Sequence, residues 1–471
     1  MIHTIQEKIQ ATRKFWGSKY QGFHFITDKQ ARVANARREK LLDAIRSRVN
    51  HAFQDSKLHT GALSKGCQLC GQGRWSCLFI NFTCNADCFF CPGSGYKQGT
   101  GSLTNADGVS FDSSRDYADY VRRFDIRAVS FSGGDPLLTF DRFMDYLTRL
   151  REDFGNRIYI WLYTNGLAAT EENLERLRDA GLDEIRFNIA ATNYQLDKVK
   201  MATRIMDKVT VEIPMIPEDR NLVKQRLVEM SRIGVDYLHL HQLMVIGTNH
   251  EALRARGYVL SHGLTPPVVD SELMALDLMA FALDEKLDLP VQYCSWVYKS
   301  RWHVRSQNTR LNARTMRGFE SETQGGLVRR IWIEAASKGL PCISEEFEKR
   351  DPGGDFWLFN REEDRIYCHH SLLSSVEASQ YRISLAYFRP VLEKQEQVKD
   401  GSSLNYREVK VNDHKTVRIV LHQISDPMIL SFRDALDLET IYMRHESAGS
   451  RSGIPGLEKF ESIGYGLPDY V

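Results

Sequence analysis

Three cysteines lie within eight residues of one another, in the segment CNADCFFCP that begins at Cys84. They are Cys84, Cys88 and Cys91, and no fourth cysteine stands beside them. Thiolates are strong metal ligands, and a structural metal ion usually takes four protein ligands. Three closely spaced thiolates therefore predict a metal centre that keeps one coordination position open, and an open position is where chemistry can occur.

Three further cysteines precede this group and can be paired with it in more than one way. Six of the nine cysteines fall between Cys67 and Cys91. Cys67, Cys70, Cys88 and Cys91 have the spacing C-x2-C-x17-C-x2-C, which is in the range of a zinc ribbon. That grouping leaves two cysteines without a role, and it places WSCLFINF, a segment typical of a core strand, in the middle of the ribbon.

The other interpretation divides the six cysteines into two groups of three. Cys67, Cys70 and Cys77 would form a second metal site, holding an iron–sulfur cluster or zinc, with Cys294 as its fourth ligand. Cys368, or a histidine of YCHH (367–370), is the next choice for the fourth ligand, and unmetallated core thiols are the alternative. An extended chain from Cys77 to Cys84 spans about 23 Å, so one cluster cannot readily use both.

The elements around these cysteines follow a repeating pattern. Short apolar segments of the kind that form buried strands alternate with helix-like segments, such as the one that begins after Thr170 and ends at Gly181. The expected strands are 77–82, 127–133, 158–166, 184–190, 209–214 and 237–243, with 289–296 as a further candidate. The pattern predicts an α/β fold, a partial (β/α)6-type barrel of parallel strands with right-handed crossovers.

Candidate ligand residues fall where these strands end. CNADCFFC follows the first strand, GGDP (133–136) the second, TNG (164–166) the third, and Asn188 lies near the end of the fourth. In parallel β/α folds ligands bind at the carboxyl ends of the strands. The sequence therefore predicts one binding site at that end of the barrel.

The rest of the chain is expected to form smaller parts around the barrel. We predict an N-terminal helical segment over 1–65, including an amphipathic helix over 28–53, and the barrel with its additional cysteines over 66–300. A helical extension over 301–350 and a smaller mixed or β-rich C-terminal domain over 351–471 follow.

The composition excludes several partners. The formal net charge is +1, with 42% hydrophobic and 26% charged residues, so no charge excess favours nucleic acid. No apolar run reaches the length of a membrane span, and the N-terminus lacks the pattern of a signal peptide. We expect a cytoplasmic protein, in which clustered cysteines are more typical of metal binding than of disulfides.

Two motifs together resemble those of a known family. The C-x3-C-x2-C loop after the first strand, with Phe90 before its last cysteine, resembles the radical S-adenosylmethionine (radical SAM) superfamily. FSGGDPLL (131–138) resembles that family's GGEP loop, with Asp135 in place of glutamate. The agreement covers about 66–250. More narrowly, CQLC…WSCLFINFTCNADCFFCP with the later YCS resembles uncharacterised proteins related to pyruvate formate-lyase-activating enzyme.

The resemblance implies a cofactor set and a reaction. Cys84, Cys88 and Cys91 would ligate a [4Fe–4S] cluster whose open iron binds S-adenosylmethionine (SAM). Reduction by an external electron donor would cleave SAM to methionine and a 5′-deoxyadenosyl radical, which abstracts a hydrogen atom from an organic substrate. The substrate would be a small molecule or a peptide, or the protein would activate a glycyl-radical enzyme. A non-catalytic zinc or iron–sulfur protein is the alternative of a different class.

The resemblance also implies roles for single residues. Phe90 would lie near the adenine, Gly133 and Gly134 would let the backbone approach the methionyl amino group, and Asp135 would accept a hydrogen bond with a shorter reach than glutamate. Two asparagines would hold the SAM carboxylate or ribose, and one glutamate the ribose hydroxyls; the alternative for each is strand-end capping or a buried hydrogen bond. These residues are Asn165, Asn188 and Glu212.

Basic residues later in the chain could contact a substrate. His239 and His241 alternate with leucines, so both point to one face of the sixth strand, where they would meet substrate or remain satisfied core histidines. Lys299, Arg301 and Arg305 follow YCSW and could recognise a carboxylate or phosphate, or form a solvated helix face.

Overall fold

The computed structural model describes residues 5–17, 21–93, 104–246, 248–263, 265–335, 339–375, 381–393, 404–443, 454–467 and 470. The chain divides into two units. The first comprises Met1–Ser300 together with Tyr465–Val471, and the second comprises Arg301–Gly464.

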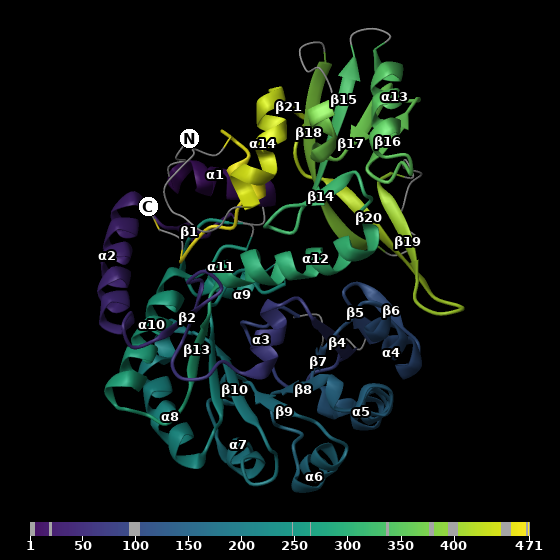
Figure 1. Cartoon of the computed structure of the whole chain (residues 1–471). Helices are drawn as coiled ribbons and strands as arrows, with labels where there is room; N and C mark the ends of the chain where they lie inside the picture. The colour runs from purple at the N-terminus through teal and green to yellow at the C-terminus, as the bar shows by residue number, and fades with distance from the viewer. Residues whose placement is uncertain are drawn as a thin grey trace. The chain divides into compact units, whose positions relative to one another are not determined.

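A curled sheet of seven parallel strands forms the centre of the first unit (Figure 1). The order across the sheet is β13-β11-β10-β9-β8-β7-β4, and every pair in that series is parallel. The strands are β4 (Trp75–Asn81), β7 (Ala128–Gly133), β8 (Tyr159–Thr164), β9 (Glu184–Phe187), β10 (Val209–Pro214), β11 (Tyr237–His241) and β13 (Val291–Cys294). The predicted partial barrel of parallel β/α units is confirmed.

Helices cover the outer face of this sheet (Figure 1). Their ends follow sequence signals: Thr170 caps α6 by accepting a hydrogen bond from the Asn173 N–H, and Gly234 ends α8 with a positive φ of 80°. The covering helices are α4 (Ser114–Arg123), α5 (Phe140–Phe154), α6 (Glu171–Asp179), α7 (Asp197–Ala202), α8 (Arg220–Ile233) and α10 (Val269–Asp284).

Short strands extend the sheet at both edges in places where no strand was predicted. β2 (Asn50–Ala52) and β3 (Lys57–His59) add beyond β13, and β5 (Thr104–Ala106) and β6 (Val109–Phe111) add beyond β4. All four additions pair in antiparallel fashion. Periodicity over three residues is too short to distinguish a strand from a loop.

The N-terminal region differs from its prediction in two ways. The basic helix α2 spans Asp28–Ile45 rather than 28–53, and three residues with positive φ, Phe53 to Asp55, turn the chain before β3. The short helix α3 (Lys65–Gly71), which Ser64 caps and which contains GCQLCG, is not among the elements predicted from the sequence. The remaining elements of this unit are α1 (Ile5–Trp16), β1 (His24–Phe25), α9 (His250–Ala255), β12 (Val259–Leu260) and α11 (Trp296–Tyr298).

The chain returns to the first unit after the second unit is complete. Tyr470 is buried, donates a hydrogen bond from its hydroxyl to Glu272 at 2.5 Å, and has the Arg38 guanidinium 4.6 Å from its ring centre. Within the second unit, Arg301 at its beginning donates to the backbone carbonyl of Gly464 at its end, at 2.8 Å. The two ends of the second unit therefore lie side by side.

The second unit is built on an antiparallel sheet. Its main order is β16-β17-β15-β18-β20-β19, with β14 paired to β15 and β21 to β18. The strands are β14 (Glu320–Glu322), β15 (Val328–Ala335), β16 (Trp357–Asn360), β17 (Arg365–Cys368), β18 (Tyr381–Glu393), β19 (Tyr406–Lys410), β20 (Thr416–Gln423) and β21 (Met428–Leu430). The helices are α12 (Val304–Thr315), α13 (Leu340–Arg350), α14 (Phe432–Met443) and α15 (Glu458–Glu461).

This sheet begins earlier in the chain than the sequence suggested. Residues 301–350 were expected to be helical, yet β14 and β15 lie among them. The long strand β15 carries arginines that are buried in ion pairs, Arg329 with Glu461 and Arg330 with Glu320. Buried strands normally contain few charged residues, so the arginines of β15 kept this strand from being recognised in the sequence.

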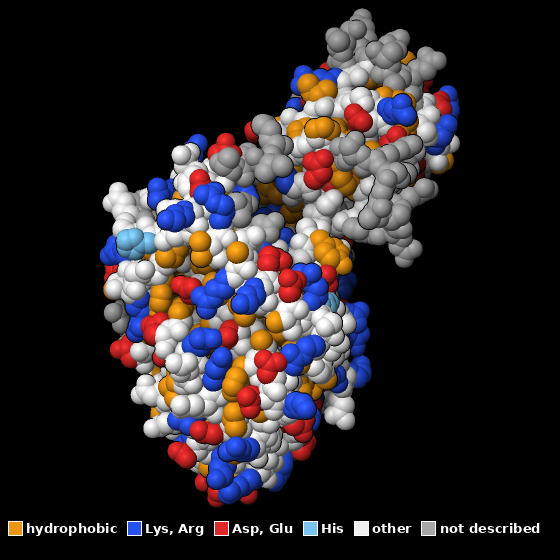
Figure 2. All heavy atoms as spheres, turned by 90° about the vertical axis from the view of Figure 1, so that its left-hand side faces the viewer, with side chains coloured by type: hydrophobic (Ala, Val, Ile, Leu, Met, Phe, Trp, Pro, Cys, Tyr) orange, Lys and Arg blue, Asp and Glu red, His pale blue; other side chains and the backbone are white. Residues whose placement is uncertain are grey.

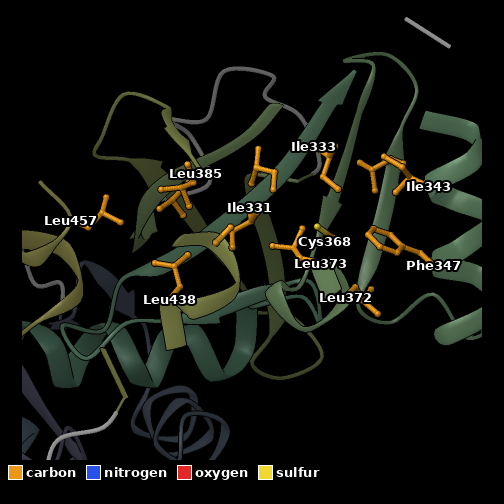
Figure 3. Packing of buried hydrophobic residues seen from close by; sticks show 14 of the residues in the cluster. Ile331, Ile333, Ile343, Phe347, Cys368, Leu372, Leu373, Leu385, Leu438 and Leu457 are labelled. Atoms are coloured by element: carbon orange, nitrogen blue, oxygen red, sulfur yellow. The ribbon is translucent and has the colours of Figure 1, made fainter. Parts of the chain in front are cut away.

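Cys368 belongs to the apolar core of the second unit. Figure 3 shows it among Ile331, Ile333 and Leu373, and its side chain is fully buried there. Burial raises the pKa of the Cys368 thiol to about 12. It is therefore a core thiol in this unit, rather than the alternative fourth metal ligand that the sequence suggested.

The surface carries mixed charge. On the face drawn in Figure 2, basic and acidic side chains are interspersed. None of the described helices combines the length and the apolar character that crossing a bilayer requires.

Candidate functional site

The carboxyl ends of the parallel strands open into a cavity of about 370 Å³. It lies within the first unit, and every parallel strand or the segment directly after it contributes to its lining. Among the lining residues are Cys84, Cys88, Cys91, Phe90, Gly133, Gly134, Asn165, Asn188, Glu212, His241 and Lys299. Cys84, Cys88 and Cys91 were predicted to bind a cluster, and seven other residues to bind its SAM. All of these residues except one line this single cavity.

The three cysteines of the loop after β4 are half-buried and face this cavity. The Cys91 backbone N–H donates to the Cys88 carbonyl at 3.1 Å, and the Gly93 N–H donates to Cys91 Sγ at 3.3 Å. Burial, together with the nearby Cys84, raises the pKa of Cys91. In the described part of the chain no three His, Cys, Asp or Glu side chains are spaced as a finished metal site.

Gly133 and Gly134 are needed for a close approach between two backbone segments. The Gly134 N–H donates to the Asn81 carbonyl at 3.2 Å, and the Asp135 N–H donates to the Thr83 carbonyl at 2.8 Å. A Cβ on Gly134 would lie 1.8 Å from the Thr83 carbonyl oxygen, and one on Gly133 would lie 2.2 Å from that of Asn81. The missing side chains thus make room for the start of the cysteine loop. Both glycines also line the cavity, and the approach of their backbone to a ligand stays a prediction.

Asp135 is the predicted residue that does not line the cavity. Its side chain is 1% exposed and accepts hydrogen bonds from the Thr164 hydroxyl at 2.9 Å, the Asn165 N–H at 2.8 Å and the Leu137 N–H at 3.0 Å. Burial raises the pKa of its carboxyl group, and these donors oppose the rise. Asp135 follows β7 and accepts hydrogen bonds from Thr164 and Asn165 at the end of β8, so it joins the ends of these two strands. Its carboxylate oxygens are therefore occupied by donors from the protein.

The two asparagines have different surroundings. Asn165 uses both atoms of its amide: Nδ2 donates to Asn85 Oδ1 at 2.7 Å and to Cys84 Sγ at 3.7 Å, while Oδ1 accepts from the Leu167 N–H at 2.9 Å. Asn188 Oδ1 is buried at the cavity and has no hydrogen-bond partner in the described structure. A buried polar atom without a partner is uncommon in proteins, so this atom fits a ligand that donates to it.

Phe90 is held at the cavity by its backbone as well as its ring. Its carbonyl oxygen accepts a hydrogen bond from Asn249 Nδ2 at 3.1 Å, and its ring meets that of Phe89 edge to face at 5.3 Å between centroids. A flat apolar face beside the thiols, a partnerless amide oxygen and thiolate-forming donors suit a cluster with a SAM molecule.

Glu212 is the centre of an ionic network that lines the cavity. Its carboxylate lies 3.0 Å from His239 Nδ1, 2.9 Å from His241 Nε2 and 3.1 Å from Arg186 Nη1. Burial alone would raise the pKa of Glu212, but these three neighbours outweigh it and hold that pKa well below the usual range. Both carboxylate oxygens therefore have partners within the protein, and the contact of Glu212 with ribose stays a prediction.

Sequence reasoning missed the other half of this network. Arg186 is 2% exposed, donates to both oxygens of Glu184 at 2.8 and 3.1 Å, and has its guanidinium 4.5 Å from the Trp161 ring centre. Glu184 also accepts from the Thr210 hydroxyl at 2.6 Å. The available signal was the alternation in EIRF, where two charged residues occupy positions i and i+2 of a buried strand and so point inward together.

His241 connects Glu212 to a lysine. Lys299 Nζ lies 2.9 Å from His241 Nδ1, while His241 Nε2 faces Glu212. Burial and the adjacent Lys299 ammonium lower the pKa of His241 to about 4, so the imidazole is neutral at neutral pH. The tautomer that satisfies both contacts carries its proton on Nε2, donates to Glu212 and accepts from Lys299. The prediction that His239 and His241 share the inner face is confirmed by this geometry.

Three cysteines of the predicted second metal site lie near a buried lysine, and one of them contacts it. Lys57 is 1% exposed; its Nζ lies 3.8 Å from Cys294 Sγ and 4.2 Å from the centre of the Tyr298 ring. Burial lowers the pKa of Lys57, whereas the neighbouring Cys294, Cys67 and Cys70 raise it. The effect of the cysteines is the larger, so the pKa of Lys57 is raised overall. Gln292 Nε2 donates to Cys67 Sγ at 2.8 Å.

Cys77 is not part of that group. It lies on β4, where its thiol is hydrogen-bonded to Ser130 and Ser132 and burial raises its pKa to about 12. The structure thus brings together three of the four predicted ligands, with an ammonium group among them. The zinc-ribbon grouping is divided as well, because Cys67 lies beside His239 whereas Cys88 and Cys91 face the cavity.

Two further basic candidates lie elsewhere. Arg301 donates to the Gly464 carbonyl, and Arg305 donates from Nε to the Gln324 carbonyl at 2.5 Å. Both contacts are within the second unit. Of the three basic residues after YCSW, Lys299 is therefore the one that lines the cavity.

Comparison with known proteins identifies relatives of the first unit. A family model described as the radical SAM superfamily matches residues 78–219. A Methanocaldococcus jannaschii protein named "Putative glycyl-radical enzyme activating enzyme" is 26% identical over 300 residues, covering 61% of this chain and 78% of that protein. A Saccharolobus islandicus "Probable GTP 3',8-cyclase" is 25% identical over 190 residues, covering 37% of this chain and 58% of the cyclase.

Solved structures resemble the chain only weakly. Streptococcus suis SuiB bound to S-adenosylmethionine aligns with a TM-score of 0.33 and 12% identity, covering 46% of this chain and 49% of SuiB. Coproporphyrinogen III oxidase from Escherichia coli aligns with a TM-score of 0.30 and 15% identity, covering 47% of this chain and 56% of the oxidase.

Proposed function

Because the chain belongs to the radical SAM superfamily and is an enzyme that uses a [4Fe–4S] cluster and SAM, we propose that Cys84, Cys88 and Cys91 hold that cluster. When bound, the cluster and SAM supply a 5′-deoxyadenosyl radical, which abstracts a hydrogen atom from an organic substrate in the same cavity. An external electron donor reduces the cluster.

One observation carries this proposal. The three cysteine thiols, the backbone of Gly133 and Gly134 and the partnerless oxygen of Asn188 all line one cavity at the carboxyl ends of the parallel strands. Donors for iron and a buried acceptor for an organic ligand are thus placed together. The cavity volume of about 370 Å³ is in the range of small-molecule sites.

The residues around the thiols have separate tasks in this proposal. Asn188 Oδ1 accepts a hydrogen bond from SAM, and the Phe90 ring packs beside the adenine. Asn165 orients Cys84 through its Nδ2 contact, and Asp135 fixes Asn165 by accepting its backbone N–H. Asp135 is therefore a positioning residue, which replaces the direct contact with SAM suggested by the family motif.

The test is SAM cleavage by the reconstituted enzyme. The protein is loaded with iron and sulfide under anaerobic conditions and incubated with SAM and dithionite, and 5′-deoxyadenosine is measured. We expect it from the wild type and none from the variant in which Cys84, Cys88 and Cys91 are all alanine. Cys342→Ala is the matched control, because Cys342 is exposed on α13 in the second unit. If the triple variant still cleaves SAM, the ligand assignment is wrong.

Activation of a glycyl-radical enzyme is the second candidate function. The observation in its favour is the M. jannaschii relative, whose name states that activity and 78% of whose length aligns. The assay incubates the reduced enzyme and SAM with a glycyl-radical enzyme from the same cell and measures the glycyl radical by electron paramagnetic resonance. A radical on that partner supports activation. Its absence, with 5′-deoxyadenosine still formed, favours a small molecule or a peptide.

A second metal centre, as a [4Fe–4S] cluster or zinc, is a separate and weaker proposal. It is supported by three thiols gathered in one place, those of Cys67, Cys70 and Cys294. Against it stands the Lys57 ammonium, which a cation would have to displace. The test is metal analysis of the variant in which Cys84, Cys88 and Cys91 are all alanine. Retained iron with sulfide, or retained zinc, supports a second centre, whereas the absence of retained metal contradicts it.

A further inference from the structure

We propose that the substrate of this enzyme carries an anionic oxygen group, a carboxylate or a phosphate, and that Lys299 binds it in the part of the cavity lined by His241 and Glu212. The inference rests on the proposed function, because it names the substrate class for that same cavity. It depends on where Lys299 lies, on how its ammonium is held, and on which groups face it.

The cavity has two chemically different ends. Cys84 follows β4 at one edge of the parallel strands, and Lys299 follows β13 at the other edge. The thiols, the glycine backbone and the two asparagines come from β4, β7, β8 and β9, whereas Glu212, His241 and Lys299 come from β10, β11 and the segment after β13. The curl of the sheet brings both edges to one cavity, so a substrate can reach from the ionic end toward the thiols.

The ammonium of Lys299 is fixed by a chain of partly buried contacts. Its Nζ lies 2.9 Å from His241 Nδ1, His241 Nε2 lies 2.9 Å from Glu212 Oε1, and Glu212 Oε2 lies 3.1 Å from Arg186 Nη1. Lysine side chains are flexible, and ordering them on binding a ligand is unfavourable. Here that order exists before any ligand arrives, which favours a binding role.

Lys299 lacks the partner that its charge calls for. Among the described residues it forms no ion pair with Asp or Glu, and its one hydrogen-bond partner is the neutral imidazole nitrogen of His241. An ammonium group has three N–H donors and forms its strongest hydrogen bonds with anionic oxygen. Glu212, which shares His241 with Lys299, already accepts from both histidines and Arg186. A carboxylate or phosphate of the substrate would complete the surroundings of Lys299.

The carboxylate of SAM itself is a second source of the same chemistry. In the proposed function SAM lies at the cysteine end, where the Asn188 oxygen and the Phe90 ring are available. Lys299 contacts His241 of the ionic network rather than the thiols or the asparagines, so we assign it to the substrate. The experiment separates the two sources.

The test measures access to the Lys299 amine and needs no substrate. The anaerobically reconstituted enzyme, with SAM present, is acylated by a limiting N-hydroxysuccinimide ester, and modification of each lysine is quantified by peptide mass spectrometry. The reaction is run in potassium chloride, succinate or inorganic phosphate at equal ionic strength, so that general screening is the same. Lys29, which is exposed on α2, serves as the internal control.

We expect succinate or phosphate to slow the acylation of Lys299 about threefold when present at about twice its dissociation constant, because two thirds of the sites are then filled. Lys29 should react equally in all three salts. The anion that protects better identifies the group as carboxylate or phosphate. Equal rates for Lys299 in all three salts would overturn the inference.

A comparison with and without SAM distinguishes the two sources. With potassium chloride as the salt, the acylation rate of Lys299 should agree within about twofold whether SAM is present or absent, because SAM is held by other residues of the cavity. Protection of Lys299 by SAM alone would assign the lysine to SAM and overturn the inference. A wild-type enzyme that forms no 5′-deoxyadenosine would instead contradict the proposed function, and the protection by anions would still be read separately.

Discussion

Acidification should destabilise the first unit through His241. The pKa of this imidazole is lowered to about 4 by burial and by Lys299, compared with 6.5 in an unfolded chain. Between pH 6.5 and about pH 4, His241 is protonated in the unfolded chain but stays neutral in the folded chain. The free energy of unfolding therefore falls as the pH falls from 6.5 to about 4, and above pH 6.5 the effect is absent.

The size of the effect follows from the two pKa values. A difference of about 2.5 units corresponds to about 3.4 kcal/mol once both states have titrated. Between pH 7 and pH 5 the same difference amounts to about 1.8 kcal/mol. The side chain is 27% exposed, and water will reduce the effect, so we expect about 1 kcal/mol or more over that interval.

Two measurements check this reasoning. Histidine labelled with carbon-13 in the ring reports each imidazole by nuclear magnetic resonance, and the signal missing from His241→Gln identifies His241. That signal should not shift between pH 7.5 and pH 5.5. Urea unfolding at pH 7 and pH 5 should show a smaller loss of stability in His241→Gln than in the wild type, while His24→Gln, which removes an exposed imidazole, should behave as the wild type.

The result that refutes the reasoning is a midpoint for His241 between pH 6 and pH 7. It would mean that Lys299 does not hold its ammonium against Nδ1, and the ionic end of the cavity would need a different description. Lys299→Met should raise the midpoint above that of the wild type, because it removes the second cause of the shift and leaves burial in place.

Two predictions concern the backbone that carries the cysteine loop. Gly134→Ala should reduce the free energy of unfolding by about 3 kcal/mol or more, because its Cβ would meet the Thr83 carbonyl at 1.8 Å; unchanged urea unfolding would show that the two segments can separate freely. Asp135→Ala should reduce it by a similar amount, about 3 kcal/mol, since two N–H groups and the Thr164 hydroxyl lose their buried acceptor. Asp141→Ala, at an exposed aspartate, is the control for Asp135→Ala. Equal stability of Asp135→Ala and Asp141→Ala would contradict the role given to Asp135.

The sequence predicted those features that depend on local pattern. The strands appeared as apolar runs, and Thr170 and Gly181 marked the ends of a helix, because burial and capping act over a few residues. The placement of Cys84 and Asn188 at one end of the sheet followed from parallel topology alone. Thus the fold and the position of the cavity could be predicted without a structure.

What could not be predicted depends on partners distant in the sequence. Nothing near Asp135 indicates that Thr164 and Asn165 use its carboxylate, and nothing near Lys57 indicates that it lies among thiols from α3 and β13. A charged residue in a buried strand, such as Arg186, makes sense only after its acids on neighbouring strands are known. Single-sequence patterns carry no information about such pairs.

The adjoining ends of the second unit make it an insertion in the architecture of the first. Because Arg301 contacts Gly464, the chain enters and leaves this unit at one place, and Tyr470 then completes the buried group around Glu272 in the first unit. A domain that is inserted in this way can be exchanged or removed by joining its flanks, without opening the host fold. Removal of 302–463 through a short glycine–serine bridge should thus yield a minimal barrel, whereas truncation after residue 300 should not, because it also discards Tyr470.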